Sequence, residues 1–256
     1  MFMQNNCNSG NMHGEFSNVP RYQRRNQYKG SDISEIVESM LQVLECFYTE
    51  EEESVFLVVK RETFIGVHDL CSRDARHIIS DLYSRITGRT MANLDFENIK
   101  SCLQDIAYHN DRIEPSYRVC RKDDAIFIDL CDNDHNIVKI TADGWDVIRN
   151  EEIFFARTGR TRPLPIPERD GSFDGIRRII NTANEDNFVM LVGFIVSIFN
   201  ARGNMPMLLV SGEQGTGKSS AMRYIKRIVD PNGIDLQSMP ASKEESLFML
   251  RHHYLV

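Results

Sequence analysis

The 256-residue sequence lacks the net positive charge of a basic DNA-binding domain and the long apolar run of a membrane-spanning protein. It has 30 lysines and arginines against 37 aspartates and glutamates, a formal net charge of −7. That balance excludes a domain that is basic throughout, so a contact with DNA would need a local patch or another subunit. The longest apolar run, 188–199, is shorter than the roughly 20 residues that span a membrane. We therefore expect a buried helix there and no membrane partner.

Paired cysteine motifs are also missing. The cysteines are widely spaced, and none belongs to a C-x-x-C or zinc-knuckle pattern. The apolar core of a secretory signal does not stand ahead of them. We therefore expect reduced thiols in a cytoplasmic protein rather than disulfides. The six cysteines are Cys7, Cys46, Cys71, Cys102, Cys120 and Cys131.

The composition is that of a globular protein, and its changes along the chain predict four segments. Hydrophobic residues make up 41%, enough for a packed core in one large domain or two ordinary ones. Residues 1–30 are polar and predict a disordered tail, and residues 31–160 predict an α+β domain. Residues 161–170 are proline-rich and predict a linker, because they suit neither a helix nor a central strand. Residues 171–256 then begin a second domain.

The polar tail has a local cluster of basic and aromatic residues. Such a cluster can contact the backbone of single- or double-stranded DNA and stack on its bases. Composition alone favours the other interpretation, a solvated tail without a partner. The residues concerned are Arg21, Tyr22, Arg24, Arg25, Tyr28 and Lys29.

Hydrophobic periodicity predicts the elements of residues 31–160. Apolar residues at steps of three and four predict one amphipathic helix over 31–48. β-branched runs predict a hairpin, two helices follow, and Gly88 is expected to end the first of them in a left-handed conformation. Four short strands then predict an antiparallel meander. The hairpin strands are 55–59 and 64–67, and the meander strands are 117–120, 125–130, 137–141 and 144–148.

One turn of this meander resembles the start of a calcium loop. Asp132, Asp134 and Asn136 have its first three ligand spacings. However, Ile137 stands where the sharp bend requires glycine, and Asp143 stands where a bidentate glutamate is required. The sequence therefore favours a hairpin turn.

Beyond the linker, helices and a strand surround a glycine motif. Helical spacing predicts helices at 173–182, 187–200 and 242–251. The apolar run 207–210 predicts a buried parallel strand, and helical spacing resumes from Ala221. We therefore expect a parallel α/β core around the glycine motif, after the α+β region.

The glycine motif predicts a phosphate-binding loop. Gly212, four residues, then Gly217, Lys218 and Ser219 match G-x-x-x-x-G-K-[ST] between the expected strand and the expected helix. Glycines let successive backbone N–H groups surround phosphate oxygens at a helix N-terminus. Lys218 is the candidate catalytic residue because it would reach the β and γ phosphates, and the hydroxyl of Ser219 would bind Mg²⁺. The alternative is a plain glycine turn with a solvated lysine.

The expected ligands of this loop are ATP and Mg²⁺. Its backbone is predicted to supply most of the phosphate contacts, Thr216 acting through its N–H more than its side chain. The predicted nucleotide-binding residues are Gly212, Glu213, Gln214, Gly215, Thr216, Gly217, Lys218 and Ser219.

The second half of the sequence resembles a known family. Segments IDL (128–130), VKITADGWDVI (138–148), PLPIPERDGS (163–172), FVMLVGFIVSIF (188–199) and LLVSGEQGTGKSSAMRYIKRIVDP (208–231) resemble phage and prophage proteins related to superfamily 3 primase-helicases. The resemblance implies that residues 171–256 begin a P-loop α/β domain of AAA+-like type, which is incomplete in this sequence. It also implies ATP binding at the glycine loop, a second strand carrying acidic residues for Mg²⁺, and a homo-oligomeric ring that pulls on DNA.

The sequence departs from that family beyond the loop helix. The acidic strand is expected to begin near HHYLV (252–256), and its acids, the polar sensor and the arginine that acts across subunits are not among the 256 residues. This pattern leaves two main hypotheses: a fragment of a DNA-processing NTPase, or a regulatory module that binds ATP without hydrolysing it. A small-molecule kinase is a weaker third, since the long N-terminal region is unlike such compact enzymes. Because hydrolysis needs placed Mg²⁺, an oriented water and an arginine, we expect this chain to be a poor ATPase.

Overall fold

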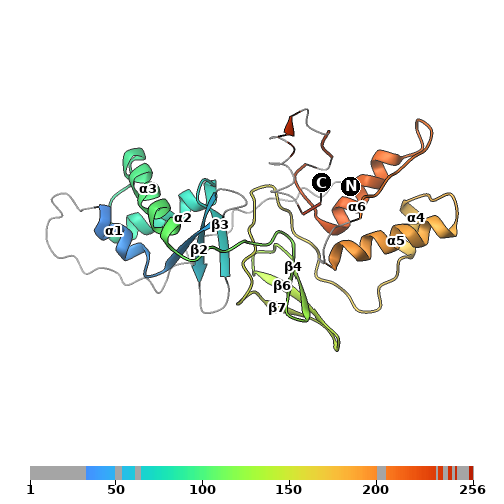
Figure 1. The fold of residues 1–256 in the computed structure, drawn as a ribbon, viewed down its shortest axis with the longest axis horizontal. Helices are drawn as coiled ribbons and strands as arrows, with labels where there is room; N and C mark the ends of the chain where they lie inside the picture. The colour runs from blue at the N-terminus through green and yellow to red at the C-terminus, as the bar shows by residue number, and fades with distance from the viewer. Residues whose placement is uncertain are drawn as a thin grey trace, which may run out of the picture.

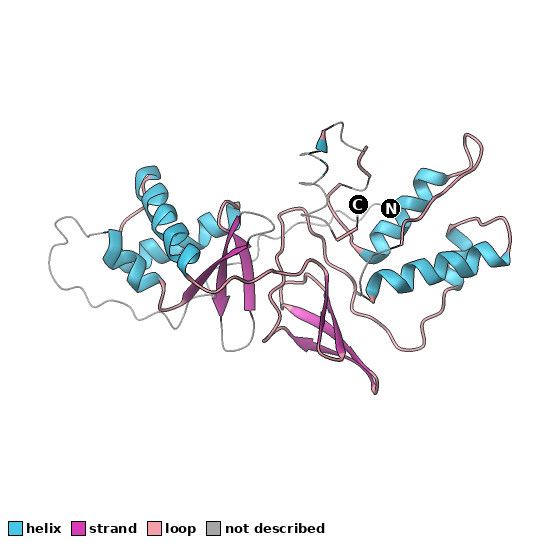
Figure 2. Ribbon diagram, in the orientation of Figure 1, coloured by secondary structure: helices cyan, strands magenta, loops and turns pink. Residues whose placement is uncertain are grey.

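The computed structural model describes most of the chain between residues 33 and 255. The predicted tail and most of the predicted helix 242–251 lie outside the described residues. Helices and two small antiparallel sheets make an α+β mixture, arranged in Figures 1 and 2 as an N-terminal group of helices and strands, a central β-meander and a C-terminal group of helices. The described residues are 33–49, 54–60, 65–200, 206–234, 236–238, 242, 243, 246, 254 and 255.

The N-terminal unit (residues 33–109) places three helices beside a three-stranded sheet of order β1-β2-β3. All neighbouring strands are antiparallel, and the register pairs Cys46 with Leu57 and Val58 with Val67. The predicted hairpin and both predicted helices are confirmed. The elements are α1 (Ile33–Met40), β1 (Leu44–Thr49), β2 (Ser54–Lys60), β3 (Ile65–Asp69), α2 (Arg73–Thr87) and α3 (Asn93–His109).

The predicted single helix over 31–48 is wrong in its second half. Helix α1 ends at Met40, and Leu44–Thr49 is strand β1. Leu44 and Phe47 continue the helical spacing of α1, but β1 pairs with β2 along its whole length. Backbone pairing with a neighbouring strand therefore overrides the local periodicity.

Helix α2 has the ends that its sequence predicts. The hydroxyl of Ser72 accepts a hydrogen bond from the N–H of Ala75, which caps the first turn. Gly88 ends the helix with φ 69°, and its N–H donates to the carbonyl of Ser84. A residue with a Cβ would be strained at that φ, so glycine is the expected terminator.

The main core lies between the three helices and one face of the sheet. Met40, Leu57, Ile79 and Leu103 are fully buried in it. The opposite face of the sheet forms a second, smaller cluster around Phe47. The N-terminal sheet is therefore covered on both faces.

The segment 150–157 joins this unit to the meander. Phe154 and Ala156 pack against the second cluster of the N-terminal sheet, whereas Ile153 and Phe155 pack into the core of the meander. Such alternation is the side-chain period of an extended strand. One extended segment therefore contributes to two cores.

The meander confirms the four predicted strands, in the order β4-β5-β6-β7. All three pairs are antiparallel, and the register places Ile128 beside Val138 and Ile140 beside Trp145. The turn before β6 is closed by Asp132, whose carboxylate accepts the backbone N–H of Asn136 at 2.8 Å, as a hairpin turn would be. The strands are β4 (Val119–Lys122), β5 (Ala125–Asp129), β6 (Asn136–Thr141) and β7 (Gly144–Arg149).

The proline-rich segment 161–170 contains no helix or ladder strand, as predicted. It is attached at both sides. The N–H of Leu164 donates to the carbonyl of Leu130 at 2.9 Å, and the N–H of Arg162 donates to the carbonyl of Pro231 at 2.9 Å. An isolated antiparallel bridge also pairs Thr161 with Asn232. The segment therefore connects the end of strand β5 with the turn after helix α6 (Lys218–Val229).

The C-terminal group contains helices α4 (Asp174–Ile179), α5 (Glu185–Phe199) and α6. Helices close to the predicted ranges are confirmed, but α5 is only half buried. Its inner face packs against α6, whereas Met190 is 72% exposed and Val189 is 60% exposed. None of the helices in the described ranges combines the length and the apolar character needed to cross a bilayer.

The predicted buried strand 207–210 is not observed. These residues belong to no strand, and Met207 and Leu209 are 94% and 88% exposed. Their neighbours Leu208 and Val210 are partly buried, so one face of the segment lies on the protein and the other faces outward. Within the described residues no strand pairs with it, and the predicted parallel α/β sheet is therefore absent from that part of the chain.

Candidate nucleotide-binding loop

The glycine motif forms an exposed loop, residues 211–217, directly before α6. Gly212, Gly215 and Gly217 have φ of 156°, 85° and 83°. A Cβ on Gly212 would lie 3.0 Å from Oγ1 of Thr216, too close for an ordinary contact. Glycine at this position therefore allows the loop to close on itself.

The loop ends at the N-terminus of a twelve-residue helix. Gly217 is the N-cap, in the left-handed conformation, and the first helical hydrogen bond runs from the N–H of Ala221 to the carbonyl of Gly217 at 2.9 Å. The N–H groups of Lys218, Ser219 and Ser220 precede that bond, so the helix itself gives them no acceptor. The first turn contains no acidic residue. This helix end therefore carries donors and partial positive charge for an anion.

Lys218 lies over the loop. Its ammonium group donates to the carbonyl oxygens of Gly212 and Glu213 at 2.8 and 2.6 Å. The hydroxyl of Thr216 donates to the same carbonyl of Glu213 at 2.8 Å. Phosphate oxygens are stronger acceptors than neutral carbonyls, so a bound phosphate would compete for these hydrogen bonds of the lysine.

Ser219 is exposed in the first turn of α6, beside the lysine. Within the described part of the chain its hydroxyl has no recorded hydrogen bond, and Lys218 has no ion pair with a carboxylate. A serine in the first turn of such a helix can place its oxygen on a cation that bridges bound phosphates. The residues present therefore fit a nucleotide with its Mg²⁺.

Helix α6 is held by its apolar face. Ile225 and Val229 are buried against Leu191, Ile195 and Ile198 of α5. This packing leaves the first turn of α6 and its loop free on the surface. The loop therefore depends on the position of one helix rather than on a surrounding sheet.

The far end of α6 is fixed by a buried ion pair. Asp230, 4% exposed, accepts a hydrogen bond at 3.0 Å from Nε of Arg118, which is 3% exposed and immediately precedes β4. The terminal nitrogens of the same guanidinium donate to backbone carbonyls. Nη1 bonds the carbonyl of Asp129 at 3.0 Å, and Nη2 bonds those of Arg162 and Pro231 at 2.8 and 3.2 Å. One arginine thereby joins the meander, the proline-rich segment and the loop-bearing helix.

The Arg118–Asp230 pair could not be found from the sequence. Arg118 and Asp230 are 112 residues apart, so no local periodicity relates them. Arg118 is unusual only in the structure, where its φ of 57° is uncommon for a residue with a Cβ. The sequence does not reveal this conformation.

A second ion pair, between buried Asp129 and partly buried Arg157, lies beside the first. Both carboxylate oxygens of Asp129 accept from Arg157, at 2.9 and 2.6 Å. Burial, with the positive charge of Arg157 adding to it, lowers the pKa of His135 from 6.5 to about 4. Burial also lowers the pKa of His68 on β3, although the negative charge of Asp74 opposes that shift. Both imidazoles are therefore neutral near pH 7.

The structure places the eight predicted loop residues in one continuous turn, at the start of α6. Tyr254 and Leu255, from the segment expected to begin the acidic strand, lie at the opposite end of α6. The N–H of Leu255 donates to Asp230 at 3.3 Å, and the hydroxyl of Tyr254 donates to the carbonyl of Ile198. The basic tail cluster lies outside the described residues.

Comparison of the chain with family models, with curated proteins and with solved structures gives no significant match.

Proposed function

We propose that this protein binds the phosphates of ATP, or of another nucleoside triphosphate, at the loop 211–217. The observation that carries the proposal is the position of Lys218. Its ammonium group lies over the loop carbonyls while the first N–H groups of α6 are left without helical acceptors. The oxygens of a triphosphate would accept hydrogen bonds from these N–H groups, and its negative charge would pair with the ammonium of Lys218.

The finer proposal rests on the sequence resemblance. The chain would be part of a phage- or prophage-type NTPase related to primase-helicases, acting on DNA as a ring of identical subunits. In that family a second strand presents the acidic residues that complete the Mg²⁺ site, and the resemblance places its start near residues 252–256.

Nucleotide binding is tested by titrating the full chain with a fluorescent ATP analogue in the presence of Mg²⁺. We expect a micromolar dissociation constant that Lys218→Ala raises at least about tenfold, because a lysine–phosphate contact is charge-assisted. The matched control is Arg227→Ala, which removes a positive charge from the last turn of the same helix. Equal affinities of the native chain and Lys218→Ala would reject the proposal.

A second candidate is a module that binds ATP without hydrolysing it. It is favoured because, among the described residues, no cluster of His, Cys, Asp or Glu side chains that could hold the Mg²⁺ lies at the loop. Without an arginine finger, worth about 10³–10⁵ in rate, we expect little steady-state turnover. Turnover of several ATP per second that disappears in Lys218→Ala would contradict this candidate and favour the NTPase.

A further inference from the structure

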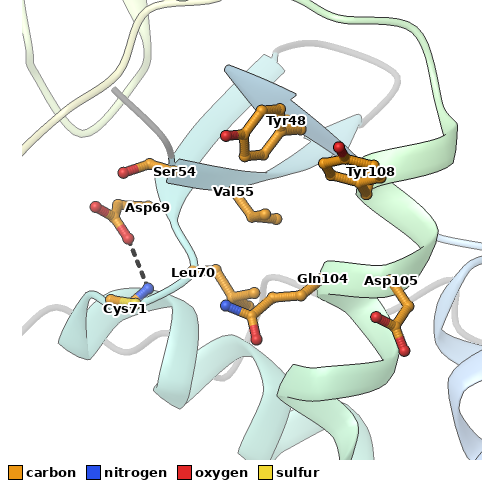
Figure 3. A pocket seen from close by; sticks show the side chains of 9 residues that line it. All are labelled: Tyr48, Ser54, Val55, Asp69, Leu70, Cys71, Gln104, Asp105 and Tyr108. Atoms are coloured by element: carbon orange, nitrogen blue, oxygen red, sulfur yellow. Dashed lines mark hydrogen bonds between the residues drawn. The ribbon is translucent and has the colours of Figure 1, made fainter. Parts of the chain in front are cut away.

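A pocket on the N-terminal unit lies between the ends of its strands and helix α3 (Figure 3). Its volume is about 260 Å³. In this view Tyr48 and Tyr108 stand close together above Val55, and Asp69 and Asp105 lie on opposite sides. The lining residues are Tyr48, Ser54, Val55, Asp69, Leu70, Cys71, Gln104, Asp105 and Tyr108.

Two tyrosines form one wall of this tyrosine pocket. The ring centroids of Tyr48 and Tyr108 are 5.5 Å apart, and the rings are tilted by 59°. The guanidinium of Arg112 lies 5.8 Å from the first centroid and 5.9 Å from the second. The two rings therefore already accept a planar cation in the folded chain, through the attraction between a cation and an aromatic face.

The charge of the pocket is negative. Asp69 and Asp105 line it, and none of the nine lining residues is basic, although Arg112 lies near its two tyrosines without being part of the lining. One oxygen of Asp69 accepts the backbone N–H of Cys71 at 2.6 Å, which holds the carboxylate in place. Such a site disfavours phosphates and is therefore unlike the glycine loop.

The size of the pocket limits the ligand. Pockets for drug-sized molecules measure about 300–1,000 Å³, so this one suits a single side chain or a small fragment. Aromatic rings beside carboxylates and the amide of Gln104 match a flat group that stacks and also donates several hydrogen bonds. A guanidinium does both, whereas an ammonium group donates hydrogen bonds but does not stack.

We propose that the tyrosine pocket binds the guanidinium group of an arginine side chain. The guanidinium stacks on Tyr48 or Tyr108 and donates to a carboxylate, and its alkyl stem packs on Val55 and Leu70. The arginine can come from this chain's own basic sequence 21–29 or from a separate peptide. Its chemistry is the same in both cases.

The test uses the full chain labelled with 3-fluorotyrosine, in which Tyr48→Phe and Tyr108→Phe assign the two ¹⁹F resonances. The probe is N-acetyl-arginine amide, and its matched control is N-acetyl-citrulline amide, which has nearly the same shape without the charge. We expect saturable shifts of these two resonances, with arginine binding at least about tenfold more tightly than citrulline. Equal shifts with the two probes, or shifts at other tyrosines only, would overturn the proposal.

The carboxylates are tested with Asp69→Asn combined with Asp105→Asn. We expect this variant to bind the arginine probe at least about fivefold more weakly. The control is Glu38→Gln with Glu97→Gln, which removes the same charge from exposed positions of α1 and α3 and should change affinity less than about twofold. Unchanged ¹⁹F resonances of the remaining tyrosines establish that each variant is folded. Full affinity in the double aspartate variant would reject the site.

The source of the arginine is distinguished in the full chain by changing Arg21, Arg24, Arg25 and Lys29 to glutamine. If these residues fill the pocket, the added probe binds more tightly to this variant than to the native chain, because a tethered competitor is lost. If a separate peptide is the source, the two affinities are equal. Either result supports the guanidinium site and assigns its source.

Discussion

The N-terminal unit and the region around the glycine loop support their surfaces in different ways. Among the described residues, the main core beneath the tyrosine pocket contains eighteen buried residues, from a sheet and three helices. The cluster beside the loop-bearing helix contains six described residues, nearly all from α5 and α6. Met207 and Leu209, just before the loop, are among the most exposed apolar side chains of the described residues.

The two sites are therefore held in place by different contacts. The pocket is positioned by many contacts, so no single contact outside its lining should be decisive. Helix α6 carries the loop at one end and is tied at the other end by the Arg118–Asp230 pair. The glycine loop should therefore be sensitive to a buried contact at the opposite end of its helix.

The largest expected effect comes from breaking that pair. Asp230→Ala leaves the guanidinium of Arg118 buried without its carboxylate, which costs about 3–5 kcal/mol of unfolding free energy. Urea unfolding at neutral pH measures the loss as a lower midpoint. Nucleotide affinity should fall in the same variant if the pair positions the loop.

The control for this prediction replaces both partners by apolar residues. Arg118→Met with Asp230→Leu removes the buried charge together with the ion pair. It also leaves the carbonyls of Asp129, Arg162 and Pro231 without the hydrogen bonds of Arg118, so it should restore only part of the lost stability. A single variant that loses less than about 1 kcal/mol would indicate that solvent reaches the pair. The glycine loop would then not depend on the Arg118–Asp230 pair for its position.

Local signals predicted much of the N-terminal unit and the meander. Ser72 and Gly88 mark the ends of α2, and alternating residues mark the meander, because caps and strand faces are properties of neighbouring residues. The error at Leu44–Thr49 arose because the apolar steps of α1 continue into a segment whose hydrogen bonds go to β2. Pairing partners are non-local and leave no trace in the periodicity.

The candidate loop was predictable for the same reason. Its glycines, Lys218 and Ser219 are adjacent in sequence, and their types determine the turn and the helix start. The Arg118–Asp230 and Arg157–Asp129 pairs join distant segments, so only the fold brings them together. The run 207–210 was misjudged because an apolar run predicts burial, whereas burial on both faces requires a paired and covered strand.

The unfolding free energy should depend on pH through His135, which lies beside the Asp129–Arg157 ion pair. Its pKa is lowered from 6.5 to about 4, so the unfolded chain binds a proton more readily than the folded chain between these values. Stability from this group is complete above pH 6.5 and is lost as pH falls toward 4. The loss from His135 is at most about 3 kcal/mol. His68, whose pKa is also lowered, acts in the same direction.

The measurement compares unfolding free energies of the native chain and His135→Asn between pH 7.5 and 4. Asparagine suits this position because residue 135 has φ of 56°, a conformation that asparagine tolerates. We expect a flatter pH dependence in the variant, with Asp129, Asp132 and Arg157 unchanged around it. If the unfolding free energies of the two proteins depend equally on pH, His135 is solvated and contributes no pH-dependent stability.

The smallest expected effect tests whether 207–210 is open on its outer face. Leu209 is 88% exposed, so Leu209→Ser should change the unfolding free energy by less than about 0.5 kcal/mol. Leu208 packs on the cluster between α5 and α6, and the matched change Leu208→Ser should cost about 1–3 kcal/mol. Urea unfolding of both variants at several protein concentrations measures the difference. If Leu209→Ser lowers the unfolding free energy as much as Leu208→Ser, the outer face of 207–210 is covered in solution. If this loss also rises with protein concentration, another copy of the chain covers that face, because only an intermolecular contact depends on concentration.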